Sequence, residues 1–368
     1  MKELLNHLGK KKLIMIFGGV IGIVIFLILV LLGYNAIFGK STFQKVENKV
    51  VEAAKKYYSE HEELLPKNEN EEVSTTDKSL TEAGYLKSME VLTKRLNATC
   101  TATVLVNYAN GEYRYTPILD CGDKYSSQTL SSYIKKHESI VYTGQGLYDL
   151  NGELVYRGEN PNNYVTFSGK SWRIVKIEND YVVMILNQKS DKSVWDDRFN
   201  TDRNRNEGIN EYPISRIFDN VKALYDGNKL FSNNTKNLLA THTLYIGKRG
   251  ESEGVNDGSI EKDVYFKDQI IGLLPLYDYI NASIDSKCSS AYTSSCSNYN
   301  YLNHYQYSWW LLTADKDNTY RVFKVDMNGM ISSNKANSSG YIRPVIYLAK
   351  DVLYAGGNGT VENPYTIK

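Results

Sequence analysis

The feature that most constrains this chain is an apolar run near its start, Leu13 to Leu32, which contains no charge and no proline. A helix over this run, at about 1.5 Å per residue, reaches about 30 Å, the thickness of a bilayer's hydrocarbon core. Lys10, Lys11 and Lys12 precede it, so the positive-inside rule predicts a cytoplasmic N-terminus and an exported remainder. We favour this uncleaved anchor over a cleaved signal peptide, because Gly33-Tyr34-Asn35 is not a small-x-small cleavage site.

The length and composition of the chain limit the functional classes to which it can belong. The chain has 368 residues, so we expect two folded units besides the anchor. Lys+Arg number 43 and Asp+Glu 42, which leaves no charge excess of the kind that nucleic acid attracts. We therefore expect no nucleic-acid partner. Four cysteines outside a membrane indicate disulfides rather than thiol chemistry.

One disulfide follows from strand register. Asn110-Gly111, between Cys100 and Cys121, is the strongest short hairpin signal and predicts a two-residue type I′ turn. With the turn placed there, Cys100 and Cys121 face each other at a non-hydrogen-bonded site, within disulfide reach. Cys288 and Cys296 then remain, and we favour a structural disulfide that closes the Ser-rich loop between them over a catalytic thiol pair.

The N-terminal third resembles a type IV pilin subunit. The resemblance rests on the apolar helix, the amphipathic stretch around Ala53-Ala54-Lys55-Lys56-Tyr57-Tyr58, a Gly84-Tyr85-Leu86 step and the Cys-bridged hairpin, over about residues 13–125. It implies a membrane helix that continues into a small α/β domain. The chain lacks the Phe-Thr-Leu-Ile-Glu type of processing site, which favours a pilin-like stalk over a pilus subunit.

The C-terminal part changes to short β-like runs with polar turns. It resembles a family of uncharacterised bacterial extracellular domains, over about Asn151 to Lys368. The shared motifs are Trp172-Arg173-Ile174, Gly272-Leu273-Leu274 before Tyr277-Asp278-Tyr279, Trp309-Trp310, Arg343-Pro344-Val345 and Asn363-Pro364-Tyr365. In broader outline, Gly340 to Pro344 is similar to the C-type-lectin-like fold of formylglycine-generating enzymes, an analogy of fold alone.

These observations give an α+β fold class: a transmembrane helix, a pilin-like α/β-hairpin stalk and a β-rich C-type-lectin-like domain. The predicted divisions are a cytoplasmic tail (1–12), a membrane helix (13–34), a pilin-like extracellular domain (35–125), a linker (126–140) and a lectin-like domain (141–368). The predicted location is the bacterial cell membrane, with a single pass and the bulk of the chain outside.

Four residues are candidates for ligand binding: Trp195, Trp309, Trp310 and Arg343. Adjacent residues on a strand point to opposite faces, so one of Trp309 and Trp310 could form a ligand platform, although packing under a loop is the interpretation we favour. Arg343 also fits a buried anchor paired with a carboxylate such as Asp278.

Five aspartates are candidates for a metal site: Asp196, Asp197, Asp202, Asp315 and Asp317. Hard oxygen ligands of this kind suit Ca²⁺. We favour solvated loops over a Ca²⁺ site, because Arg198, Arg203 and Arg205 would offset the first group's charge. Otherwise we expect no cofactor.

The leading hypothesis is a non-catalytic surface protein that binds an extracellular glycan, wall polymer or protein, with the loops 187–210 and 251–268 as its recognition surface. One alternative is a minor pilin-like component of a surface assembly. Another is an oxidoreductase of the formylglycine type, which needs free thiols. No Ser-His-Asp order, P-loop or paired carboxylate supports a catalytic function, and we favour a protein that is not an enzyme.

Overall fold

The structure is a computed structural model that describes residues 42–68, 71–109, 111–250, 253, 257–288, 293–303 and 306–368. The predicted cytoplasmic tail and membrane helix, residues 1–34, lie outside these ranges. Among the helices within them, none is both long enough and apolar enough to cross a bilayer.

This finding corrects two sequence-based predictions, the fold class with its transmembrane helix, pilin-like stalk and lectin-like head, and the single-pass membrane location. The described chain is a mixed helix-and-sheet structure without a membrane-spanning helix. Its first helix, residues 42–60, is amphipathic: it buries Phe43, Val46 and Val50 but exposes Lys49 and Glu52. Such a helix covers a protein core with one face and meets water with the other.

The described chain divides into two compact units. The first comprises residues 42–64, 74–104 and 117–127, and the second comprises residues 65–73, 105–116 and 128–368. The division runs through a three-stranded sheet of order β1-β2-β3, made by β1 (Glu72–Thr76), β2 (Thr101–Ala109) and β3 (Glu112–Asp120).

The β2–β3 hairpin has the predicted pairing of cysteines. Cys100 and Cys121 form a disulfide, with their Cα atoms 4.1 Å apart. The predicted turn residue Asn110 lies outside the described residues, but Gly111 has a φ of 80°, as a type I′ turn requires. Ala102, Val104 and Leu119 are buried, as the alternation predicts. The first unit also contains η1 (Glu62–Leu64), α2 (Asp77–Glu82), α3 (Met89–Thr93), η2 (Lys94–Leu96) and η3 (Gly122–Lys124).

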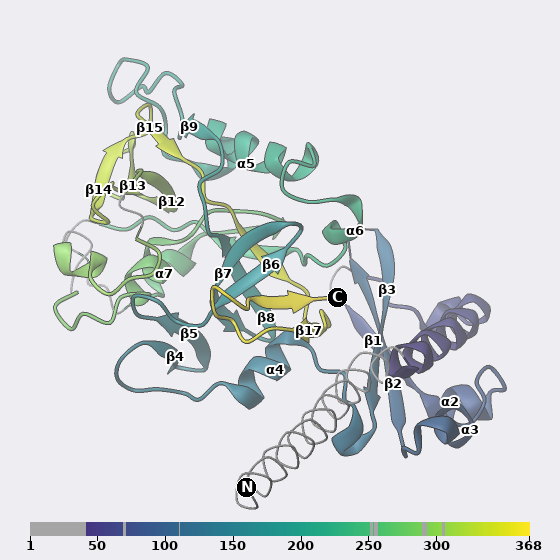
Figure 1. Cartoon of the computed structure of the whole chain (residues 1–368). Coiled ribbons are helices and arrows are strands. Elements are labelled where there is room, and N and C mark those ends of the chain that lie inside the picture. Colours follow the sequence, from purple (N-terminus) through teal and green to yellow (C-terminus); the bar gives the residue numbers. More distant parts are fainter. Residues whose placement is uncertain are drawn as a thin grey trace, which may run out of the picture. The chain divides into compact units, whose positions relative to one another are not determined.

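The second unit is built on two larger sheets, whose strands other than β16 and β18 are labelled in Figure 1. The eight-stranded sheet has the order β16-β8-β7-β6-β18-β17, with β5 also paired to β7 and β4 paired to β5. Its strands are β4 (Gly146–Leu150), β5 (Glu153–Arg157), β6 (Tyr164–Phe167), β7 (Lys170–Glu178), β8 (Tyr181–Leu186), β16 (Val345–Leu348), β17 (Tyr354–Gly356) and β18 (Tyr365–Ile367). The meander β6–β7–β8 consists of short strands joined by polar turns, as predicted in general terms for the C-terminal part.

The five-stranded sheet has the order β14-β13-β12-β15-β9. Its strands are β9 (Lys192–Val194), β12 (Trp309–Ala314), β13 (Arg321–Val325), β14 (Ile331–Lys335) and β15 (Ser339–Tyr341). The remaining elements are α4 (Leu130–His137), η4 (Tyr212–Ile214), α5 (Arg216–Asp226), α6 (Asn233–Lys236), β10 (His242–Tyr245), η5 (Ile260–Asp263), β11 (Tyr265–Gln269), α7 (Leu276–Asn281) and η6 (Ser294–Ser297).

The central strands of both sheets are covered on two sides. All six residues of β12 are buried, and so are five of the six in β8. Strands buried on both faces carry near-continuous apolar runs instead of alternation, which is why Trp309–Trp310–Leu311–Leu312 and Val182–Leu186 have that composition. The core of the second unit lies along these strands, and its polar loops are displayed beyond the strand ends.

Candidate functional site

Two neighbouring pockets on the second unit form one groove, which we call the lysine groove. The first pocket has a volume of about 420 Å³ and is lined by residues 169–171, 186, 188–191, 229 and 230. The second, about 470 Å³, is lined by residues 168, 170 and 228–234. The two pockets share Lys170, Lys229 and Leu230, so they adjoin each other, and each has the volume of a small-molecule site.

The turn between β6 and β7 forms one wall of the groove. Ser168 and Gly169 both have positive φ, 51° and 70°, which defines a two-residue type I′ turn. The hydroxyl of Ser168 accepts hydrogen bonds from the Ser232 amide (3.3 Å) and the Thr235 hydroxyl (3.1 Å). This turn therefore positions Lys170 at the start of β7 and joins the two pockets' walls.

The segment after β8 forms the opposite wall, and it is the first part of the predicted recognition loop 187–210. The Asn187 amide donates to the Ser171 carbonyl (3.0 Å), and the Ser190 amide donates to the Ile342 carbonyl (2.8 Å). Ile342 in turn donates its amide to the Asp191 carbonyl (2.9 Å). Backbone hydrogen bonds thus fix the segment that carries Gln188, Lys189 and Asp191.

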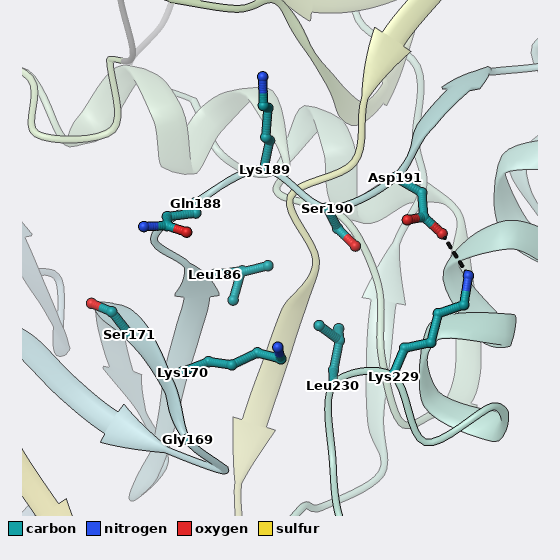
Figure 2. Close-up of a pocket in the computed structure, with 10 residues that line it drawn as sticks. All are labelled: Gly169, Lys170, Ser171, Leu186, Gln188, Lys189, Ser190, Asp191, Lys229 and Leu230. Atoms are coloured by element: carbon teal, nitrogen blue, oxygen red, sulfur yellow. Dashed lines mark hydrogen bonds and ion pairs between the residues drawn. The ribbon is translucent and has the colours of Figure 1, made fainter.

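The third wall follows α5. Gly227 caps that helix, and the next residues turn back toward the core, where Leu230 and Phe231 are buried. The Phe231 ring stacks on Trp172, with ring centroids 5.8 Å apart. Leu230 and Leu186 give the groove an apolar floor, and Lys229 is held at its rim (Figure 2).

The charges in the groove are unbalanced. Lys229 Nζ lies 2.9 Å from a carboxylate oxygen of Asp191, drawn as a dashed line in Figure 2. Lys189 Nζ lies 4.3 Å from the ring centroid of Tyr341, a cation–π contact. Lys170 extends between Leu186 and Leu230 and has no acidic partner among the described residues. The lining therefore contains three ammonium groups and one carboxylate.

The aromatic and arginine residues singled out from the sequence lie elsewhere. Trp195, Trp309, Trp310 and Arg343 each expose 0% of their surface and are part of the core. Trp310 donates its ring N–H to the Ser193 carbonyl (3.1 Å). Both Trp309 and Trp310 are buried because both faces of β12 are covered.

Arg343 is a buried anchor, although not of the predicted kind. It donates to the carbonyls of Leu186 (3.2 Å) and Leu302 (2.8 Å), and its guanidinium lies 4.5 Å from the Trp309 ring centroid. Burial lowers the pKa of Arg343 to about 10. Asp278, suggested as its partner, instead pairs with Lys176.

Four of the five candidate aspartates, Asp196, Asp197, Asp202 and Asp315, bind protein groups through their carboxylates. Asp196 accepts from the Arg198 guanidinium (3.0 Å) and the Ile209 amide (2.7 Å), and Asp197 pairs with Arg216 at 2.8 Å.

Asp202 accepts from the Thr319 hydroxyl (2.8 Å), and Asp315 accepts from the Asp317 amide (2.8 Å). In the part of the chain that the structure describes, no group of three or more His, Cys, Asp or Glu residues could hold a metal ion. The five aspartates therefore do not assemble into one metal centre.

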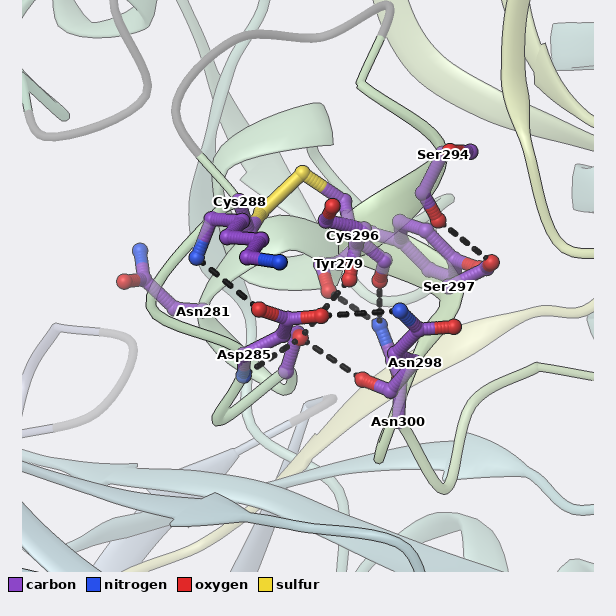
Figure 3. The surroundings of a disulfide bond; sticks show 12 residues. Tyr279, Asn281, Asp285, Cys288, Ser294, Cys296, Ser297, Asn298 and Asn300 are labelled. Carbon is purple, nitrogen blue, oxygen red and sulfur yellow. Dashed lines mark hydrogen bonds between the residues drawn. A yellow bond between two sulfur atoms is a disulfide. The ribbon is translucent and has the colours of Figure 1, made fainter.

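The second predicted disulfide is present. Cys288 and Cys296 are joined, and Figure 3 shows the polar network around them. The Asp285 carboxylate accepts from the Asn298 side-chain amide (2.8 Å), and Asn300 donates to the carbonyls of Tyr279 and Cys296 (both 2.9 Å). All four cysteines of the chain are thus paired, which leaves no free thiol for formylglycine-type chemistry.

Sequence reasoning missed the three lysines of the groove. Lys170, Lys189 and Lys229 come from three separate segments, the start of β7, the loop after β8 and the loop after α5, and none belongs to a basic run or a periodic pattern. The sequence signals that came nearest were the Ser168-Gly169 turn and the length of the 187–210 loop, both of which border the groove.

Comparison with known proteins gives one match. A family model described as a domain of unknown function (DUF6273) matches residues 276–350. No curated protein matches the chain, and no solved structure does. The matched segment holds α7 and β12–β16, and the groove lysines lie outside it. The resemblances to pilins and to lectin-like domains are left untested by this match.

Proposed function

We propose that the second unit is a non-catalytic binding module that recognises an acidic glycan through the lysine groove. The observation that carries the proposal is a cavity bordered by Lys170, Lys189 and Lys229 whose lining holds one carboxylate, Asp191. Because Asp191 is paired with Lys229, and Lys189 Nζ lies over the rings of Tyr307 and Tyr341, Lys170 is the ammonium group left for a ligand anion.

The neutral lining supports a sugar ligand. Ser171, Ser190 and Gln188 offer hydroxyl and amide groups, and Leu186 and Leu230 offer an apolar surface for the C–H face of a ring. A few polar groups that converge on an apolar floor are typical of small-molecule sites. The backbone hydrogen bonds of the two adjoining loops hold these groups in place before binding, which reduces the entropy lost on association.

The same lining supports binding rather than catalysis. General acid–base and nucleophilic catalysis need a titratable group within hydrogen-bond reach of the reacting atom, and usually a second group that orients it. The described residues that line the groove include no histidine and no cysteine, and their single carboxylate is paired with Lys229.

The test is a binding titration of the purified full chain with polygalacturonate, hyaluronan and neutral dextran of matched size. We expect the two acidic polymers to bind and dextran to bind at least ten-fold more weakly, and we expect affinity to fall as salt rises, because exposed charges are screened. Lys170→Gln should weaken binding about ten-fold, the equivalent of about 1.4 kcal/mol.

The matched control is Lys136→Gln, an exposed lysine of α4 that does not line the groove. It should bind like the wild type. Equal affinity for dextran and the acidic polymers, or equal losses in Lys170→Gln and Lys136→Gln, would overturn the proposal.

A further inference from the structure

A separate pocket, which we call the tyrosine pocket, lies beside β10 and β11 on the second unit. Its volume is about 260 Å³, and it is lined by residues 178, 179, 181, 241–243, 245, 268 and 347. It shares no lining residue with the lysine groove. Sites for drug-sized ligands usually measure about 300–1,000 Å³, so the tyrosine pocket suits a smaller group, of the size of one side chain.

Four aromatic rings line the tyrosine pocket. The His242 ring stacks on Tyr347, with centroids 3.7 Å apart, and the Tyr181 ring meets Tyr347 edge to face at 6.4 Å. Tyr245 supplies the fourth ring. Because burial lowers the pKa of His242 to about 3, its ring carries no charge at neutral pH. All four rings therefore present uncharged π systems, which attract cations.

Two carboxylates line the tyrosine pocket, and no lysine or arginine does. Glu178 accepts from the Tyr347 hydroxyl and pairs with Lys176 Nζ, both at 3.5 Å and both through Oε2. Its other oxygen, Oε1, has no partner among the described residues, and neither oxygen of the exposed Asp268 has one. Asp268 is thus a carboxylate of the lining whose charge no described cation balances.

A β-bulge sets the position of Asp268. The register of β10 and β11 shifts between His242 and Leu244, so that two residues of β11, Lys267 and Asp268, oppose Thr243 alone. Asp268 has a φ of 57°, a left-handed conformation that aspartate tolerates better than most residues. Bulges change the direction of side chains on the bulged strand and are frequent beside functional sites.

Two lysines of the chain already use the rings of this pocket as cation partners, although neither lysine lines it. Lys350 Nζ lies 4.7 Å from the centroid of Tyr181, and Lys262 Nζ lies 5.5 Å from that of Tyr245. Neither ammonium group is paired with Asp268. The surroundings of the pocket therefore favour ammonium groups, and the carboxylate in its lining is left for one from outside.

We infer that the tyrosine pocket binds a primary ammonium group carried on a short alkyl stem. The ammonium donates to Asp268 and to Oε1 of Glu178, and the stem lies against the tyrosine rings. A primary ammonium fits better than a quaternary one, because its three N–H groups can use the carboxylate oxygens as acceptors. This site is independent of the proposed function, since the lysine groove takes an anion and shares none of its residues.

The test titrates the purified full chain with n-butylammonium and with n-butanol, an uncharged molecule of similar size, at constant ionic strength. Ligand-observed NMR measures the two affinities. We expect butylammonium to bind about five-fold or more tightly than butanol, and tetramethylammonium to bind about three-fold more weakly than butylammonium. Equal affinity for butylammonium and butanol would overturn the site, and tetramethylammonium that binds as tightly as butylammonium would overturn the choice of a primary ammonium.

Two variants separate the carboxylate from the rings. Asp268→Asn should weaken butylammonium about five-fold, and it keeps the backbone, because asparagine also tolerates a positive φ. Tyr245→Leu should weaken butylammonium about three-fold and leave butanol unchanged, because leucine keeps an apolar surface without a π face. Wild-type affinity for butylammonium in both variants would contradict the inference.

The matched control is Asp123→Asn, which removes an exposed carboxylate of η3 outside the pocket and should bind butylammonium like the wild type. Equal losses in Asp123→Asn and Asp268→Asn would overturn the site. Lys170→Gln should also bind butylammonium normally, which distinguishes this site from the lysine groove. Nα-acetyl-lysine amide identifies the source of the ammonium: affinity equal to that of butylammonium assigns it to a lysine side chain, and weaker binding assigns it to a free amine.

Discussion

Lys176 Nζ lies 3.4 Å from a carboxylate oxygen of Asp278, in the interior of the second unit. The same ammonium group lies 3.3 Å from Glu153 and 3.5 Å from Glu178. Burial alone would lower the pKa of Lys176, but the surrounding carboxylates, Asp278 first, outweigh it and raise that pKa well above its ordinary value. One cation thus neutralises carboxylates from β5, β7 and α7.

Replacing this cation should lower the stability of the second unit. Lys176→Met leaves the buried carboxylate of Asp278 without its cation and removes one from the half-buried Glu153 and Glu178, which should lower the free energy of unfolding by about 3–5 kcal/mol at pH 7. Urea unfolding measures the loss. The matched control is Lys135→Met, which breaks an exposed pair with Asp180 (2.6 Å) and should cost less than about 1 kcal/mol.

A pH series distinguishes the electrostatic cause from lost packing. Burial raises the pKa of Asp278 above its usual range, so acid should neutralise it readily in the variant. The deficit of Lys176→Met should therefore shrink between pH 7 and pH 5. A deficit that stays constant across this range would assign the effect to side-chain volume. In the wild type the contribution of the charged Lys176 should vanish as pH rises above about 10.5, because its folded pKa lies above the unfolded one.

A second buried charge pair lies within the second unit, between β3 and the residues that follow β16. Arg114 Nε donates to Asp351 at 2.9 Å, and the Thr116 hydroxyl donates to the same carboxylate at 2.7 Å. Arg114 also donates through a second nitrogen to Asp351. Since Asp351 is fully buried, Arg114→Ala should cost about 3–5 kcal/mol.

Arg114→Lys tests whether stability depends on the two hydrogen bonds that the Arg114 guanidinium donates to Asp351. A lysine keeps the charge but cannot make two parallel hydrogen bonds, so it should recover only part of the loss. Arg216→Lys is the control, because Arg216 pairs with Asp197 in a largely exposed site and should change stability by less than about 1 kcal/mol. Chemical denaturation of both variants gives the comparison. Full stability in Arg114→Lys would show that charge alone matters there.

Much of the fold could be predicted from local sequence patterns. The turn at Asn110-Gly111 fixes the register of its hairpin, and that register alone pairs Cys100 with Cys121, as the structure shows. The β6–β7–β8 meander and the buried strand at Trp309 follow from composition and turn residues in the same way. These features depend on residues close together in the chain, where spacing decides geometry.

The candidate site depends on distant residues, and spacing could not reveal it. Lys170 and Lys229 are 59 positions apart, and they meet because the turn after β6 and the turn after α5 end at one edge of the core. Trp195 shows the converse problem: a conspicuous aromatic in a polar segment suggests a ligand contact, yet it is fully buried near Tyr212, with ring centroids 6.0 Å apart. Composition does not tell a buried side chain from a displayed one.

The two disulfides should contribute unequally. In the chain-entropy account, stabilisation grows with the length of the closed loop, and the bonds span 21 residues (Cys100–Cys121) and 8 residues (Cys288–Cys296). The double alanine variants should therefore lose about 3.3 and about 2.5 kcal/mol respectively. Denaturant unfolding of each variant, without reductant, is the measurement. A larger loss at Cys288–Cys296 would point to the hydrogen bonds of Asp285 and Asn300 as dependent on that bond.

His242 should make the second unit sensitive to mild acid. Its ring stacks on Tyr347, with centroids 3.7 Å apart, and both ring nitrogens are buried. Burial lowers the pKa of His242 to about 3, whereas an unfolded histidine titrates near 6.5. Below about pH 6.5 His242 therefore binds a proton in the unfolded state but not in the folded state. Its contribution to stability is complete above that pH and is lost progressively as the pH falls toward 3.

The size of this effect follows from one proton. Near pH 5.5 the free energy of unfolding should fall by about 1.2 kcal/mol for each unit by which the pH is lowered, because of His242 alone. His242→Gln should remove that slope between pH 7 and pH 5, whatever its own effect on stability at pH 7. His137→Gln, which replaces an exposed histidine of α4, should retain it. Urea unfolding at half-unit intervals compares the three proteins, and an unchanged slope in His242→Gln would show that the buried ring is not the group that titrates.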